Sequence, residues 1–226
     1  MRRRIATVDR LFVGGLRPLA PEGQLSGIFK APVAGPVHLG HTGLDGDEQG
    51  DRRHHGGVEK ALHHYPAEHY DAFARRWPGL AGQLAAGVLG ENVSTRGLTE
   101  HDVCIGDVFG IGGCRVQVSQ PRVPCWKINH RLDVSGASAF IAETGVTGWY
   151  YRVLEPGPLA AQDAIELLER PCPQLSLAHY WQTIHAHRPD VAELRAIAAA
   201  PGLAPDKAAR LRERADWLER NAGRGG

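Results

Sequence analysis

The chain has 226 residues, which is enough for one large domain that buries a sizeable core without disulfides or a structural metal. Its 26 Lys and Arg residues nearly balance its 25 Asp and Glu residues, and a formal net charge of +1 excludes a whole-chain field that would hold the protein on nucleic acid or anionic lipid. Four cysteines without a CxxC pair, an amino end without an apolar signal segment and apolar runs well short of roughly 20 residues predict a soluble cytoplasmic protein with free thiols.

Short strand-like runs, separated by Gly and Pro, occupy the chain up to about residue 170. The clearest runs cover residues 7–13, 27–30, 60–65, 107–109, 115–119 and 165–168. Many short strands separated by turn signals predict a mainly β domain, built as a mostly antiparallel sandwich or barrel.

Two helices are expected to interrupt these strands. Pro66 suits the first position of a helix that ends before Pro78, because proline is tolerated where the backbone N–H has no helical partner. The apolar face of this helix would consist of Tyr70, Phe73, Ala74 and Trp77. A second, weaker helical pattern covers residues 137–143 before Gly145.

The composition changes after residue 170 to one rich in Ala, Leu, Arg and Glu. Ser176 is expected to cap one helix, Asp190 a second over residues 191–200, and Leu211 lies in a third. Eight basic residues between positions 188 and 224 alternate with six acidic ones, so no helix presents a clean basic face. This pattern favours a docking or structural role over DNA binding.

The loop over residues 119–127 carries the strongest chemical signal. Its two prolines fix the backbone, so its side chains are presented in one geometry. Cys125 lies between Arg122 and Lys127, and two nearby cations would favour the thiolate, which is a good soft metal ligand. The alternative is a small buried apolar thiol, which fits Cys104 and Cys114 better.

A glycine pair offers a candidate anion site. Adjacent Gly56 and Gly57 let main-chain amides approach an anion closely, and Lys60 could supply a point charge to a phosphate.

Five histidines between positions 54 and 69 raise the question of zinc. No HExxH or CxxC arrangement accompanies them. His63 and His64 would point to opposite faces of a strand, so they do not easily bind one ion. The preferred interpretation is that these histidines are hydrogen-bonded within the protein or exposed to solvent.

Two further Gly-containing segments are considered as ligand-binding sites. Residues 43–49 begin like a calcium loop, but no glutamate occupies the twelfth position counted from Asp45, which argues against calcium. Glu91 and Asn92 carry groups that can read the edge of a heterocycle, although an Asx-type turn explains them equally well.

Taken in order, several segments closely resemble the MOSC domain family, and within it the bacterial proteins that confer resistance to 6-N-hydroxylaminopurine. These segments are residues 43–49, 55–57, 61–66, 90–95, 106–107 and 119–127. The likeness runs from about residue 5 to the end, since those proteins also carry three short helices after the MOSC domain. Its Pro-Arg-x-Pro-Cys motif is specific, whereas the Gly pairs are not.

The resemblance implies a MOSC-type β-barrel with a few interspersed helices over residues 1–170, followed by a small three-helix region over 171–226. It also implies a pterin-based molybdenum cofactor, with Cys125 as the metal ligand and catalytic residue. The implied reaction is reduction of N-hydroxylated compounds, so that 6-N-hydroxylaminopurine becomes adenine. Because the chain has no flavin or nicotinamide fingerprint, a separate reductase is expected to supply the electrons.

The candidate cofactor-binding residues combine this likeness with the chemistry of the side chains. Basic residues and glycine amides would hold the terminal phosphate, and Tyr65 or Trp126 could stack on a flat ring or belong to the core. The full set is Arg122, Lys127, Lys60, His55, Gly56, Gly57, Tyr65, Glu91, Asn92 and Gln120.

Other functions remain open at this point. Cys125 could be a nucleophile activated by a nearby histidine, which predicts activity without metal. The protein could instead carry the cofactor, or a sulfur atom on Cys125, without turnover. Nucleic-acid binding ranks last, and a homodimer is compatible with the sequence.

Overall fold

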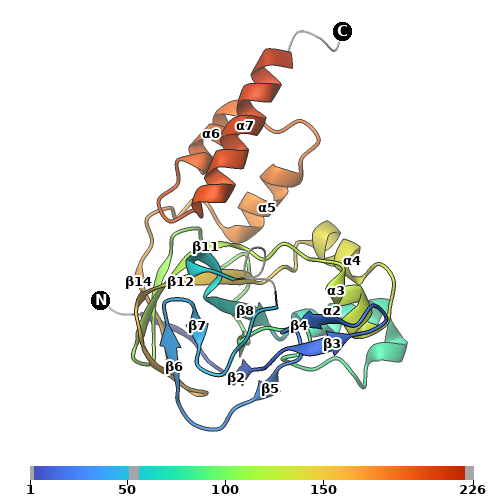
Figure 1. The fold of residues 1–226 in the computed structure, drawn as a ribbon. Coiled ribbons are helices and arrows are strands. Elements are labelled where there is room, and N and C mark those ends of the chain that lie inside the picture. Colours follow the sequence, from blue (N-terminus) through green and yellow to red (C-terminus); the bar gives the residue numbers. More distant parts are fainter. Residues whose placement is uncertain (1–2, 51–55, 222–226) are drawn as a thin grey trace.

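The computed structural model describes residues 3–50 and 56–221. Within them, nine strands form one sheet in the order β1-β14-β10-β11-β12-β8-β9-β2-β5 (Figure 1). Their bounds are β1 Arg3–Thr7, β14 Ala164–Glu169, β10 Val108–Ile111, β11 Cys114–Pro121, β12 Trp149–Glu155, β8 Leu62–Pro66, β9 Val93–Thr95, β2 Arg10–Val13 and β5 Ala31–Pro32. In this part of the chain the neighbouring strands pair antiparallel except β8 with β9, which are parallel.

The sheet closes on itself through the short link between β1 and β2. These strands lie at and near opposite ends of the strand order, yet only Val8 and Asp9 separate them. The Val8 amide donates to the carbonyl of Asp163, and the Asp9 amide donates to the carbonyl of Ser94, both at 2.9 Å. The result is a closed barrel filled by apolar side chains, which confirms the predicted mainly β fold. Its largest fully buried rings belong to Phe109, Trp149 and Tyr151.

Smaller pieces surround the barrel. A hairpin joins β3 (Arg17–Leu19) to β4 (Gln24–Ser26), and a separate sheet contains β13 (Gly157–Leu159), β6 (Val37–Gly40) and β7 (Gly43–Leu44). The short helices are η1 Val58–Lys60, α2 His69–Arg76, η2 Pro78–Leu80, α3 Lys127–Leu132 and α4 Ala137–Thr144. Together α2, α3 and α4 bury a second apolar cluster beside the barrel, in which Phe73 meets Phe140 edge to face at 5.1 Å between ring centroids.

Three sequence predictions need correction. Residues 7–13 form two strands, because the backbone at Val8 and Asp9 bonds to different neighbours. Residues 27–30 form no strand: residues 27 and 28 form a turn, where a Cβ on Gly27 would come within 2.0 Å of the Glu48 carbonyl oxygen. Pro66 ends strand β8 opposite Thr95, and the helix begins three residues later at His69. The helix expected at residues 137–143 is confirmed as α4, with Gly145 at its end in the left-handed conformation (φ 73°).

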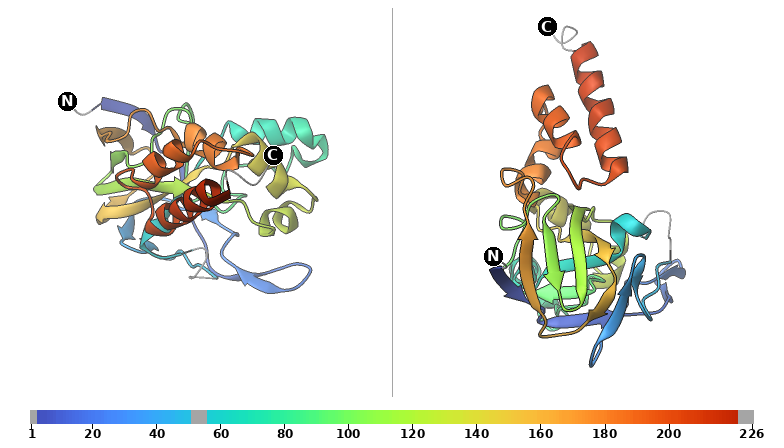
Figure 2. Two further views of the ribbon diagram at one scale, coloured as in Figure 1. Left: turned by 90° about the horizontal axis from the view of Figure 1, so that it is seen from above. Right: turned by 90° about the vertical axis from the view of Figure 1, so that its left-hand side faces the viewer.

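The C-terminal helices stand on one end of the barrel (Figure 2). They are α5 Leu177–His185, α6 Val191–Ala198 and α7 Pro205–Asn221. Ser176 Oγ accepts from the His179 amide at 3.1 Å and Asp190 Oδ1 from the Glu193 amide at 2.8 Å, so both predicted caps are confirmed. Helix α6 ends two residues earlier than predicted.

Contacts with the barrel fix the place of these helices. The Ala204 amide donates to the carbonyl of Ser119 at 2.9 Å, and the Leu177 amide donates to that of Val103 at 2.8 Å. Arg195 pairs with Asp216 and Glu219, so this basic side chain is held within the helical region. In the described ranges, no helix combines the length and the apolar character of a membrane span.

Candidate functional site

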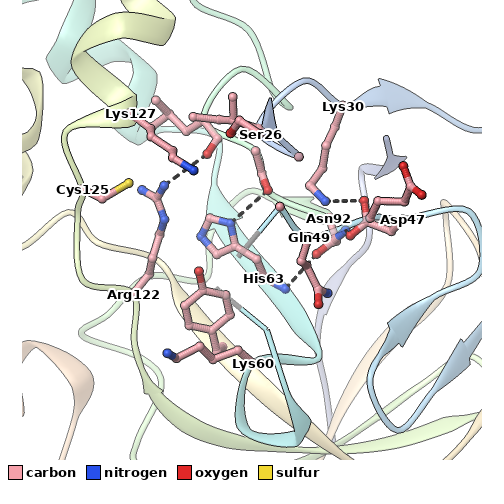
Figure 3. Close-up of a pocket in the computed structure, with 17 residues that line it drawn as sticks. Ser26, Lys30, Asp47, Gln49, Lys60, His63, Asn92, Arg122, Cys125 and Lys127 are labelled. Atoms are coloured by element: carbon pink, nitrogen blue, oxygen red, sulfur yellow. Dashed lines mark hydrogen bonds and ion pairs between the residues drawn. The ribbon is translucent and has the colours of Figure 1, made fainter. Parts of the chain in front are cut away.

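A pocket on the barrel brings together five residues predicted from the sequence. Lys60, Asn92, Arg122, Cys125 and Lys127 all line it, and it encloses about 600 Å³ including its open mouth. The loop after β11 forms one side and the segments around Lys30 and Asp47 form the other, with His63 between them (Figure 3). Segments far apart in the chain therefore build one site.

The sulfur of Cys125 points into this pocket from the loop between β11 and α3 (Figure 3). Two backbone bonds hold the loop: the Arg122 amide donates to the Gly148 carbonyl at 3.0 Å, and the Ile128 amide donates to the Cys125 carbonyl at 3.1 Å. Cys125 is half-buried, so its thiol is held in place and accessible from the pocket.

The other three cysteines, like Cys125, lie within the described residues, and all three are buried. Burial raises the pKa of the Cys104 and Cys172 thiols, and it raises the pKa of Cys114 to about 11. These thiols stay neutral and inside the protein. The sequence interpretation of Cys104 and Cys114 as buried apolar residues is confirmed.

Arg122 has an open hydrogen-bonding group at the pocket. The residue is only 6% exposed, and its Nη2 donates to the Leu89 carbonyl at 3.4 Å. Its Nη1 is buried without a hydrogen-bond partner in the described structure. Burial raises the pKa of the neighbouring Tyr150, and the Arg122 charge opposes this shift. A buried guanidinium with a free donor is suited to an anion or to a ligand carbonyl.

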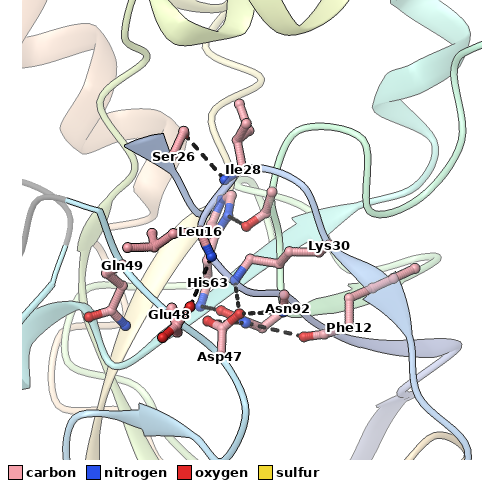
Figure 4. Close-up of polar contacts among 12 residues, drawn as sticks. Phe12, Leu16, Ser26, Ile28, Lys30, Asp47, Glu48, Gln49, His63 and Asn92 are labelled. Carbon is pink, nitrogen blue, oxygen red and sulfur yellow. Dashed lines mark hydrogen bonds and ion pairs between the residues drawn. The ribbon is translucent and has the colours of Figure 1, made fainter. Parts of the chain in front are cut away.

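The opposite wall contains a buried ion pair that was not predicted (Figure 4). Lys30 Nζ contacts Asp47 Oδ1, with the two side chains 6% and 2% exposed. Asp47 also accepts from the Gly14 amide at 3.0 Å and from Asn92 Nδ2 at 2.9 Å. Burial lowers the pKa of Lys30, and Asp47 opposes this effect. Asn92 Oδ1 in turn accepts from the His63 amide at 3.1 Å, so this wall is rigid.

His63 and His64 occupy opposite faces of strand β8, as predicted. His63 lines the pocket, whereas the His64 ring lies in the barrel interior. The His64 ring nitrogens lie 2.9 Å from the Tyr151 hydroxyl and 2.7 Å from Thr95 Oγ1. His63 is therefore, like Lys30 and Asp47, a pocket residue that sequence reasoning did not assign to the site.

Several predicted residues lie behind or beside the pocket wall. The Tyr65 ring is fully buried and its hydroxyl donates to the Val146 carbonyl at 3.1 Å, so it lies in the core. Glu91 Oε1 accepts from the Tyr70 hydroxyl and the Gly87 amide, both at 2.6 Å, and burial raises the pKa of this carboxyl. Gln120 is buried, with Nε2 3.5 Å from the carbonyl of Glu59.

The glycine pair does not reach the pocket wall. Gly57 precedes helix η1 with φ 88°, and its carbonyl accepts from the Lys60 amide, while Gly56 is half-exposed. His55 lies outside the described residues. Trp126, next to Cys125, is 44% exposed, and the Lys127 ammonium lies 5.8 Å from its ring centroid.

The comparison with protein families agrees with this arrangement. The MOSC domain model matches residues 51–166, about half of the chain, and this stretch includes strand β8 and the Cys125 loop. The chain belongs to the MOSC domain family. A relative named Protein YiiM from Escherichia coli K12 is 46% identical over 66% of this chain and 67% of its own length.

Solved structures extend the likeness over nearly the whole MOSC protein. The crystal structure of YiiM from Geobacillus stearothermophilus has a TM-score of 0.78 at 33% identity, covering 93% of this chain and 99% of that one. YiiM from Escherichia coli gives 0.77 at 33% identity, covering 96% and 94%. The predicted resemblance to the MOSC domain family is therefore confirmed, and the chain is similar to YiiM-type proteins of that family.

One further relative carries a name that refers to activity. It is a Gibberella moniliformis protein named Reductase, 38% identical over 71% of this chain. The match spans 29% of that relative's length. The activity of the whole relative therefore bears on this chain only as a proposal.

Proposed function

We propose that this MOSC protein is a molybdenum-cofactor-dependent reductase that converts N-hydroxylated compounds, such as 6-N-hydroxylaminopurine, to the corresponding amines. The observation that carries the proposal is the shared pocket of the Cys125 thiol and the buried Arg122 guanidinium. The name of the fungal relative supports a reductase, although it does not identify the substrate.

The pocket residues fit such a cofactor. A half-buried thiol is a suitable soft ligand for the metal, so Cys125 would hold it. The unpartnered Arg122 Nη1 needs an acceptor, and the cofactor's phosphate supplies acceptors and negative charge. Lys60 and Lys127 line the same pocket and would add to the binding of this anionic group.

The proposed reaction breaks one N–O bond. A hydroxylamine R–NHOH takes up two electrons and two protons and yields R–NH₂ and water. The bound cofactor would supply the two-electron reduction at its metal, and a separate reductase would restore the electrons. The chain's own contribution is to hold the cofactor through Cys125 and the pocket cations and to orient the substrate against the rigid wall around Asn92.

An activity assay of the unaltered protein and of a Cys125 variant tests this function. Cofactor-loaded protein, reduced with a viologen dye under argon, is expected to convert 6-N-hydroxylaminopurine to adenine. Cys125→Ser replaces the proposed metal ligand and should lower this rate by at least about 100-fold. Even substitutions of residues that only contact a metal ligand typically lower metal affinity or activity by about 10- to 100-fold. The matched control is Cys172→Ser, which alters a buried thiol away from the pocket and should keep the rate.

The alternatives make different predictions in the same assay. A cysteine nucleophile requires activity in metal-free protein, and a carrier requires bound cofactor without turnover. Equal rates in Cys125→Ser and the unaltered protein would contradict the proposed role of Cys125.

A further inference from the structure

The His63 side chain has a defined protonation pattern set by one neighbour. Its ring lies on strand β8, 4% exposed, with its centroid 5.1 Å from that of Tyr150. Nδ1 lies 3.3 Å from the carbonyl oxygen of Gly90. A carbonyl oxygen only accepts, so Nδ1 carries a proton and donates it to this bond.

The ring is neutral, so the other nitrogen carries no proton. Burial and the positive charges of Arg122 and Lys30 hold the pKa of His63 well below its ordinary value. A neutral imidazole has one proton, and Gly90 fixes it on Nδ1. Nε2 therefore presents a lone pair and acts as an acceptor.

This acceptor is buried without a protein partner. Nε2 of His63 has no hydrogen-bond partner among the described residues, and the same holds for Nη1 of Arg122. Both side chains line the pocket, and the two are neighbours in it (Figure 3). Unpartnered buried polar atoms are uncommon in folded proteins because their desolvation is uncompensated. Since these two belong to side chains that line the pocket, a ligand bound there can supply the missing partners.

We infer that His63 Nε2 accepts a hydrogen bond from an N–H or O–H group of the ligand bound in this pocket. The neighbouring Arg122 Nη1 needs an acceptor, so the bound ligands would present a donor to His63 beside the acceptor that Arg122 binds. This inference deepens the proposed function and rests on it, because the donor group belongs either to the N-hydroxylated substrate or to the pterin of the cofactor.

Nuclear magnetic resonance tests the protonation pattern directly, without cofactor or turnover. In two-bond ¹H–¹⁵N spectra of ¹⁵N-labelled protein, His63 should show a protonated Nδ1 and an unprotonated Nε2. Adding 6-N-hydroxylaminopurine to the protein should shift the Nε2 resonance if the substrate supplies the donor. A protonated Nε2 in the free protein would overturn the inference.

Two substitutions then separate loss of the acceptor from loss of the side chain. His63→Phe keeps a flat ring without an acceptor, and His63→Gln keeps an acceptor oxygen. Leaving a buried donor unpaired costs about 10- to 100-fold in affinity. If the substrate supplies the donor, His63→Phe should weaken binding of 6-N-hydroxylaminopurine by this factor and His63→Gln should recover most of it. His38→Phe, at an exposed position on β6, is the control and should bind normally.

The same variants identify the source of the donor. If it is the cofactor, His63→Phe lowers the pterin content per chain while substrate affinity stays unchanged. If both quantities equal those of the unaltered protein, the His63 assignment is overturned even when the enzyme reduces its substrate. Ligand binding that depends on His63, without any turnover, would instead refute the proposed reaction and retain the subsite.

Discussion

Replacing Asp47 with alanine is expected to destabilise the protein by about 3–5 kcal/mol, as is typical when one partner of a buried ion pair is removed. Lys30, 6% exposed, would lose its anionic partner, and burial would lower its pKa further once Asp47 no longer opposes this effect. The Gly14 amide and Asn92 Nδ2 would also lose their acceptor. Urea unfolding at neutral pH, followed by circular dichroism, measures the loss.

Two further variants test the physical reason for this loss. The double substitution Lys30→Met/Asp47→Asn removes both charges, and it should be clearly more stable than Asp47→Ala because no buried charge remains unpaired. Glu155→Ala breaks an exposed pair with Arg115 and should change the stability far less, because solvent screens such a pair. If Asp47→Ala and Glu155→Ala had the same small effect, the pair would not support the pocket wall.

Mild acid is expected to destabilise the fold through His64. Complete burial lowers the pKa of His64 from 6.5 to about 3. Between these values the unfolded chain binds a proton at His64 and the folded protein does not. The contribution of His64 is therefore fully present above pH 6.5 and falls by about 1.4 kcal/mol for each pH unit below it, until the folded form also protonates.

The free energy of unfolding, measured by urea between pH 7.5 and 5, tests this slope. His64→Gln can still bond to Tyr151 and Thr95 but cannot titrate, so its pH dependence should be shallower by about one proton. The buried His63 adds a second contribution of the same sign, because its pKa is also lowered well below 6.5. Identical slopes for the variant and the unaltered protein would show that His64 is not buried in its neutral form.

Local sequence signals correctly predicted those elements that depend on contacts between residues close together in the chain. Ser176 and Asp190 cap α5 and α6 because their side chains reach an amide three residues ahead. Pro66 failed as a helix start because pairing with β9 outweighs its local preference, and this pairing is a tertiary contact. The strand predicted at residues 27–30 was also wrong because of a tertiary contact: the close approach of Gly27 to Glu48 is not visible in the sequence.

The site likewise contains residues that could be predicted from the sequence and residues that could not. The Cys125 loop could be predicted because Arg122, Cys125 and Lys127 are close in sequence and all reach the pocket. Lys30 and Asp47 were missed because 17 residues separate them and only the folded chain brings them together. An isolated lysine and an isolated aspartate are usually solvated, so nothing in their spacing indicated a buried pair.

Molybdenum and released pterin per chain test the central claim most directly. The unaltered protein and Cys125→Ala are produced in a host that makes the cofactor, beside a known molybdenum enzyme as a control for supply. We predict metal and pterin in the unaltered protein and loss of the metal in Cys125→Ala, because Cys125 is the thiol exposed to the pocket. Absence of both from the unaltered protein, while the control enzyme is loaded, would contradict the account.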